Sequence, residues 1–199
     1  VLTSAIKTEK QIRISIQHQV PIIIDNHDEC LLINKLAQDL NCKARVGFRL
    51  SGFYVDEEKL YSRFGFDIEE IEEYLITNVG EDKKLNTFNV EGIHFHLDGY
   101  STKQRSEALL QCIQLIKKLN AQGFTFRFID IGGGILINYL ESKTEWLDFD
   151  AKLKKSLKGE ISPVTFNNNG LGYWLEDGIV KGERKTYPYY NEINTDKFL

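Results

Sequence analysis

Two histidines and an aspartate stand at alternate positions in the segment GIHFHLDGYS, residues 92–101. Side chains alternate between the two faces of a strand, so His94, His96 and Asp98 are expected on one face. An imidazole can transfer protons, ligate a metal or lie against a flat ring, and a neighbouring carboxylate can orient it. The segment is therefore a candidate site, with more than one chemistry open.

A second candidate is the run of three glycines in IDIGGGI, residues 129–135. Glycines remove side chains where a ligand must approach the backbone, and successive amides in such a turn can bind an anion. The dinucleotide-binding fingerprint is absent, because Gly132, Gly133 and Gly134 are not followed by a further spaced glycine. The residues alone leave a phosphate site and a tight turn as alternatives.

A metal site is the competing interpretation of the histidine pair, with Asp98 as a possible oxygen ligand. Such a site needs further ligands, and the remaining histidines, His18 and His27, fall on one expected helix and at the start of another. A hydrolase that uses His94, His96 and Asp98 on a metal is therefore the weaker alternative, and the main expectation assigns no metal ligand. Packing in the core would explain one histidine, but less easily both.

Strand-like and helix-like runs alternate strictly along the first two thirds of the chain, the order expected of a parallel sheet covered by helices. The expected strands are residues 1–5, 21–25, 44–50, 90–97 and 126–131. Capping-box patterns, which mark helix starts, begin at Thr8, Asp67 and Ser101. The periodicity fits either a doubly wound sheet or part of an eight-stranded barrel.

The longest expected helix, residues 101–122, carries apolar residues at intervals of three and four. This spacing predicts one buried stripe. Its expected members are Leu109, Cys112, Ile113, Ile116 and Leu119.

Polar residues close successive strands: Asp25, Arg49, then the histidine group, then Asp130. A barrel keeps its active site at the carboxyl ends of its strands, so this pattern favours a barrel. We therefore expect an α/β fold, with a partial (β/α)8 TIM barrel over residues 1–140. Residues 141–199 are expected to form a helix and then a short-strand or loop insertion of the same domain.

Composition and charge exclude several classes of protein. The 199 residues are 42% hydrophobic and 27% charged, which is ordinary for a globular protein. The formal net charge of −4 comes with interspersed signs, so no basic stripe is present for nucleic acid. No apolar run approaches the roughly 20 residues that span a bilayer, and the first residues do not have the order of a signal peptide. We expect a cytoplasmic protein without nucleic-acid or membrane partners.

Four segments in this order, ARVGFRL, SRFGF, GIHFHLDGYS and IDIGGGI, resemble the fold type III pyridoxal-phosphate enzymes. More narrowly, they resemble the diaminopimelate, ornithine and arginine decarboxylase branch. The similarity covers about residues 1–138, and four ordered motifs are far more specific than one. The resemblance implies a barrel of the alanine racemase and decarboxylase type, pyridoxal 5'-phosphate as the cofactor, an amino acid as the substrate and a homodimer as the intact form.

The resemblance also implies roles for individual residues. By it, His96 stacks its imidazole on the pyridine ring of the cofactor and Arg49 lies near that ring. The backbone amides of Gly132, Gly133 and Gly134 would bind the cofactor phosphate. A flat imidazole suits a flat ring, and a glycine turn can admit a phosphate.

The chain departs from the family pattern at two places. Asp98 and Gly99 stand where these decarboxylases usually have Gly-Ser, and Arg63 stands where lysine is commoner. Ser101 is the candidate to replace the phosphate-contacting serine, although capping of a helix is the alternative role for its hydroxyl.

The resemblance implies a decarboxylase-like lyase, in which the amino acid loses its carboxylate while joined to the cofactor. The family's cofactor-bound lysine would lie before Val1 and its acidic partner of the pyridine nitrogen beyond Leu199. The chain is therefore expected to be an incomplete portion that is inactive by itself. A pyridoxal-phosphate amino-acid racemase and a non-catalytic pyridoxal-phosphate carrier are the alternatives.

Overall fold

The computed structural model describes residues 1–198, which fall into two compact units: Val1–Gly134, and the described residues from Ile135 onward. The helices of the first unit are α1 (Glu9–Gln17), α2 (His27–Asp39), α3 (Ile71–Asn78) and α4 (Thr102–Ala121). Its strands are β1 (Ile22–Ile24), β2 (Ala44–Ser51), β3 (Tyr54–Val55), β4 (Glu58–Lys59), β5 (Phe66–Asp67), β6 (Phe88–Phe95) and β7 (Phe128–Asp130). Among the described helices of both units, none is long and apolar enough to cross a membrane.

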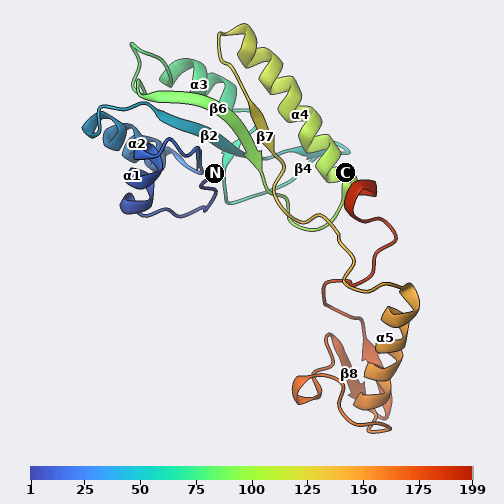
Figure 1. Cartoon of the computed structure of the whole chain (residues 1–199). Coiled ribbons are helices and arrows are strands. Elements are labelled where there is room, and N and C mark those ends of the chain that lie inside the picture. The colour runs from blue at the N-terminus through green and yellow to red at the C-terminus, as the bar shows by residue number, and fades with distance from the viewer. Residues whose placement is uncertain (199) are drawn as a thin grey trace. The chain divides into compact units, whose positions relative to one another are not determined.

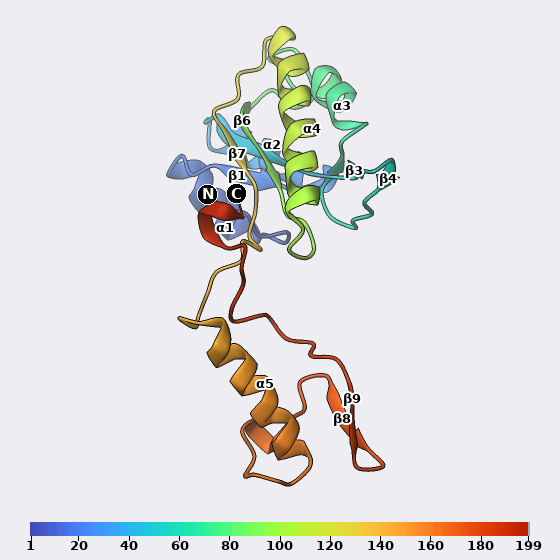
Figure 2. The ribbon, with the colours of Figure 1, turned by 90° about the vertical axis from the view of Figure 1, so that its right-hand side faces the viewer.

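The main sheet of the first unit is parallel, and its strands run in the order β1-β2-β6-β7, with the short β5 also paired to β2. Figure 1 and Figure 2 show β2, β6 and β7 as neighbours, with α4 running alongside them. Each strand of this series pairs with the next one along the chain. A doubly wound sheet reverses its strand order, whereas a barrel does not, so the sheet is part of a barrel wall and the expected fold class is confirmed.

The expected first strand, residues 1–5, is reduced to a single bridge between Leu2 and Ile22. Behind it, the strand Ile22–Ile24 is buried along its whole length. Strands that are buried on both faces are typical of parallel sheets covered by helices.

Two glycines let the centre of the sheet pack closely. Gly47 and Gly92 lie opposite each other in β2 and β6, and Gly92 lies opposite Phe128 of β7. A Cβ atom added to Gly92 would stand 2.1 Å from the Phe128 ring. The missing side chain at Gly92 is therefore the space that the Phe128 ring fills.

The helix starts follow the sequence at two of the three expected places. Thr8 forms the full capping box with Gln11, and Ser101 caps α4 by accepting a hydrogen bond from the Gln104 amide. The expectation for Asp67 is wrong, because α3 begins only at Ile71. The Asp67 carboxylate instead accepts from the Glu69 amide and forms an ion pair with Lys59.

The buried stripe of α4 departs from the expected one at Ile113, whereas Leu109 and Ile116 are partly buried and pack against the core. Cys112 and Leu119 are buried as expected, but Ile113 is 36% exposed. The buried residues of this helix are Arg105, Ala108, Cys112, Leu115 and Leu119. The stripe therefore begins with a charged residue, Arg105.

The second unit contains a helix and a hairpin. Its elements are α5 (Lys143–Leu157), η1 (Phe166–Asn168), β8 (Tyr173–Glu176), β9 (Ile179–Gly182) and η2 (Thr195–Lys197). The hairpin turns at Asp177 and Gly178, which both have positive φ, as a two-residue turn requires. The helix and short antiparallel strands agree with the sequence, whereas their place as an insertion of the barrel domain stays a prediction.

Stability should respond to a single methyl group at Gly92. We expect Gly92→Ala to lower the free energy of unfolding by about 1–3 kcal/mol, because the new methyl overlaps the Phe128 ring. Urea denaturation followed by circular dichroism measures the loss. Gly133→Ala is the matched control, since its Cβ would meet only an ordinary 3.5 Å contact. Equal stability of the two variants would contradict the packing argument.

Candidate functional site

A cavity of about 920 Å³ opens at the carboxyl ends of β2 and β6. This volume lies in the range of about 300–1,000 Å³ that small-molecule sites occupy. Its lining includes Arg49, Arg63, Phe64, His96, Asp98 and Gly134. A concave site with cations, an imidazole and a glycine turn is suited to an anionic ligand that carries a flat ring.

The strand register brings His96 to the glycine turn. His94 of β6 lies opposite Asp130 of β7, and the chain continues from each strand toward the cavity. The Gly133 amide donates a hydrogen bond to the His96 Nδ1 atom at 3.3 Å. A neutral imidazole that accepts at Nδ1 carries its proton on Nε2, so this contact selects the tautomer and orients the ring.

The three glycines serve different needs. Gly132 has a φ of +70°, and a Cβ on it would stand 2.5 Å from the Phe95 carbonyl oxygen. Gly134 has a φ of +80°, which also favours glycine. Gly133 has neither a positive φ nor a crowded Cβ position, and it is exposed. The fold therefore accounts for glycine at 132 and 134, whereas a Cβ on Gly133 would have only His96 Cε1, at 3.5 Å, within 4 Å.

The amides of the turn are not equally available to a ligand. Gly132 donates to the Asp130 Oδ1 atom at 2.9 Å, and Gly133 donates to His96. Among the described residues, the Gly134 amide has no acceptor, and Gly134 lines the cavity. A buried or half-buried amide normally has a partner, so Gly134 offers a donor to a ligand.

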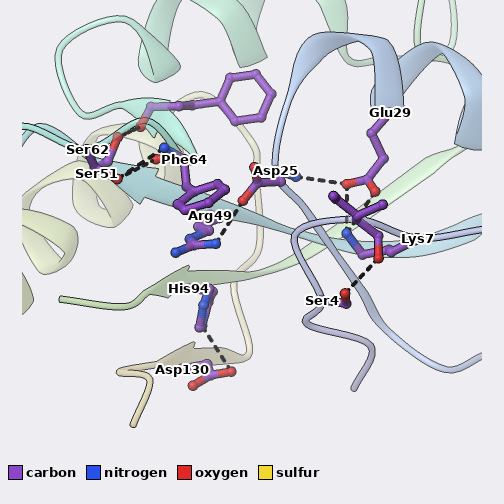
Figure 3. Close-up of polar contacts among 12 residues, drawn as sticks. Ser4, Lys7, Asp25, Glu29, Arg49, Ser51, Ser62, Phe64, His94 and Asp130 are labelled. Carbon is purple, nitrogen blue, oxygen red and sulfur yellow. Dashed lines mark hydrogen bonds and ion pairs between the residues drawn. The ribbon is translucent and has the colours of Figure 1, made fainter. Parts of the chain in front are cut away.

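Arg49 is held firmly where β2 reaches the cavity. Its guanidinium donates to Asp25 at 3.0 Å and lies 4.8 Å from the centre of the Phe64 ring. The Asp25 amide in turn donates to Glu29, whose carboxylate pairs with the buried Lys7 ammonium at 2.8 Å. Figure 3 shows the Arg49–Asp25 pair and, beside it, Glu29 of α2 with Lys7. The row of ion pairs fixes the Arg49 side chain, which is only 13% exposed.

His94 has a different environment from His96. It is buried, and its Nδ1 atom lies 3.1 Å from the Asp130 carboxylate, as Figure 3 shows. Burial lowers the His94 pKa below its ordinary value of 6.5, and the Asp130 charge opposes this shift without reversing it. His94 is therefore neutral at pH 7 and acts as a partner of Asp130, which also holds the glycine turn through Gly132.

The other expected site residues separate. Asp98 is exposed and lines the cavity, whereas Ser101 is absent from the lining and uses its hydroxyl to cap α4. In the described part of the chain, no group of three or more His, Cys, Asp or Glu side chains is arranged to hold a metal ion. The metal alternative built on His94, His96 and Asp98 therefore gains no support from the geometry.

Gln104 and Arg105 are among the residues at the site that were not anticipated from the sequence. Gln104 lines the cavity, and Arg105 bonds to the carbonyls of the glycine turn. The signal that could have found Arg105 was the spacing of α4, which puts it in line with the buried Cys112.

Comparison with known proteins identifies the family. Residues 1–177 match the family described as "Pyridoxal-dependent decarboxylase, pyridoxal binding domain". The chain belongs to this family. The cofactor is pyridoxal 5'-phosphate, and the residues present fit it: the space over Gly133 admits a group beside His96, and the Gly134 amide offers a donor at the cavity.

Individual relatives are similar at moderate identity. The diaminopimelate decarboxylase of Aquifex aeolicus is 28% identical over 186 residues, which cover 87% of this chain and 43% of the relative. The biosynthetic arginine decarboxylase of Phocaeicola vulgatus is 29% identical over 152 residues, covering 70% of this chain and 24% of the relative. The chain thus spans less than half the length of these two relatives.

A solved structure agrees with the fold. The diaminopimelate decarboxylase of Helicobacter pylori, solved in complex with L-lysine, has a TM-score of 0.58 and 23% identity. The match covers 71% of this chain and 37% of that chain. At this identity the likeness supports the barrel fold.

The buried neutral His94 predicts a pH dependence of stability. Because its pKa is lowered on folding, the unfolded state takes up the proton first as pH falls. The contribution of His94 to the free energy of unfolding is complete above pH 6.5, the pKa of the unfolded state. It is lost as pH falls from there toward the lower pKa of the folded state. We expect the free energy of unfolding to decrease over this window more steeply for the natural protein than for His94→Gln.

Urea denaturation at several pH values between about 7.5 and 5.5 measures this difference. Groups other than His94 titrate in both proteins, so the variant serves as the control. Parallel pH profiles would show that His94 is not held neutral by the fold.

Proposed function

We propose that this chain forms one wall of the pyridoxal-phosphate site of an amino-acid decarboxylase. The observation that carries the proposal is the junction of the His96 imidazole with the glycine turn at the edge of the cavity. The His96 imidazole and the glycine turn are joined by one hydrogen bond. Together they suit a ligand that has a flat ring and a phosphate. The family match and the names of the relatives support the same conclusion.

Each residue has a stated task in this proposal. His96 holds one face of the cofactor ring, with its orientation set by the Gly133 amide. Gly134 donates its amide to the phosphate, and the open space over Gly133 lets the phosphate approach the backbone. Arg49 brings a guanidinium, fixed by Asp25, to the wall of the cavity near the ring.

When bound, the cofactor ring supplies the electron sink that stabilises the charge left on the substrate after carboxylate loss. The chain's own contribution is positioning. Arg49 and His96 restrict the ring from two strand ends. Precise placement of reacting groups is worth several orders of magnitude in rate, so rigid strand ends suit this task.

Decarboxylation and racemisation are distinguished by their products. We expect the intact protein that contains this chain, supplied with pyridoxal phosphate, to release carbon dioxide from an amino acid. The first substrates to test are meso-diaminopimelate and L-arginine, after the names of the relatives. Release of carbon dioxide, with the amine as product, supports the proposal. Inversion of the α-carbon without carbon dioxide would assign a racemase, and cofactor binding without turnover would assign a carrier. The homodimer implied by the family resemblance and the cytoplasmic location expected from the sequence stay predictions.

A methyl group at Gly133 tests the cofactor position. We expect Gly133→Ala to weaken pyridoxal-phosphate binding by about 1–3 kcal/mol, because the new Cβ stands beside His96 Cε1 in the space for the ligand. Equilibrium dialysis with the cofactor's absorbance measures the affinity, and urea denaturation checks that the fold is retained. Unchanged affinity in a stable variant would place the cofactor elsewhere.

A further inference from the structure

Arg105 connects the first turn of α4 to the glycine turn after β7. Its side chain is buried, with 5% of the residue exposed. One guanidinium nitrogen donates to the Ile131 carbonyl at 2.6 Å, and another donates to the Gly133 carbonyl at 2.8 Å and reaches the Gly134 carbonyl at 3.5 Å. A single side chain thus contacts three carbonyl groups of one turn.

These contacts determine where the amides of the turn point. In a planar trans peptide, the carbonyl and the following amide point in opposite directions. Because Arg105 holds the Gly133 carbonyl, the Gly134 amide points away from the guanidinium. The same reasoning applies to Ile131, whose carbonyl binds Arg105 while the following amide donates to Asp130.

The peptide between Gly133 and Gly134 is the one that needs this support. Its amide has no acceptor within the described residues, whereas the amides of Gly132 and Gly133 are held by Asp130 and His96. Glycine residues have wide conformational freedom, so a peptide between two of them can rotate unless a partner restrains it. Arg105 is that partner, and it also places a permanent positive charge behind the turn.

We propose that Arg105 is the positioning residue of the phosphate site: it holds the glycine turn with the Gly134 amide directed to the ligand and gives the turn selectivity for a phosphorylated cofactor. This inference rests on the proposed function, because it assumes that the phosphate lies at the glycine turn. It adds a residue from α4 whose side chain acts through the backbone and does not line the cavity.

The test compares pyridoxal phosphate with pyridoxal, which has the same ring and no phosphate. Arg105→Met keeps the length and apolar stem of the side chain but removes its charge and donors. We expect its affinity for pyridoxal phosphate to fall roughly ten- to a hundredfold, the effect of losing hydrogen bonds to a charged group. Affinity for pyridoxal should change much less, so the ratio of the two affinities falls.

Two further variants complete the design. Arg127→Gln is the matched control, because Arg127 is exposed just before β7 and the substitution also removes one positive charge. The ratio of its affinities for pyridoxal phosphate and pyridoxal should equal that of the natural protein. Arg105→Lys retains the charge but cannot donate from two separate nitrogens in a fixed fork, so its ratio should be intermediate. If Arg105→Met does not fold, Arg105→Lys decides the question.

The outcomes separate the inference from the proposed function. If folded Arg105→Met has the same ratio of affinities for pyridoxal phosphate and pyridoxal as the natural protein, the proposed role of Arg105 is overturned. The same result in Arg105→Lys overturns it where only that variant folds. Equal loss of affinity for both ligands would also overturn it, because that result indicates only a structural defect. If the natural protein itself does not prefer pyridoxal phosphate over pyridoxal, the phosphate is not at the glycine turn and the proposed function fails first.

Discussion

The register between β6 and β7 is the constraint on which the site depends. His94 lies opposite Asp130, and the segments that leave these two strands carry His96 and the glycine turn side by side. A shift of one residue would turn every side chain of a strand to its other face. The packing of the Phe128 ring over Gly92 favours this register, because Gly92 is the one glycine of β6 and every other residue of that strand carries a side chain. Core packing in the sheet therefore decides whether the imidazole meets the turn.

The glycine turn is held by side chains from three elements. Asp130 belongs to β7, His96 follows β6 and Arg105 lies on α4. Backbone groups in a tight turn cannot all bond to one another, so polar side chains can provide partners for those that remain. This requirement explains why a carboxylate, an imidazole and a guanidinium gather around three residues that have no side chains. It also ties the orientation of His96 to the turn, since rotation of the ring would break its bond to Gly133.

Much of the first unit could be predicted from the sequence, because its signals are local. Alternating strand and helix patterns, the capping residues Thr8 and Ser101, and the triplet of glycines each depend on neighbouring residues. The failures involve partners outside the local pattern. Asp67 matches a capping pattern, but Lys59 competes for its carboxylate and the helix begins later. Arg105 was missed because a charged residue counts against burial, and the carbonyls that stabilise it belong to a turn in a separate segment.

The departure from the family pattern after β6 has a physical counterpart in the structure. Asp98 and Gly99 replace the usual Gly-Ser, and Ser101 uses its hydroxyl to cap α4. An anion at this edge of the sheet would lose a hydroxyl donor and gain a nearby carboxylate, and both changes disfavour a phosphate. Arg105 opposes both effects, because it supplies positive charge and orients an amide from behind the turn. In the proposed site, the phosphate therefore depends less on a hydroxyl and more on a backbone donor supported by a buried cation.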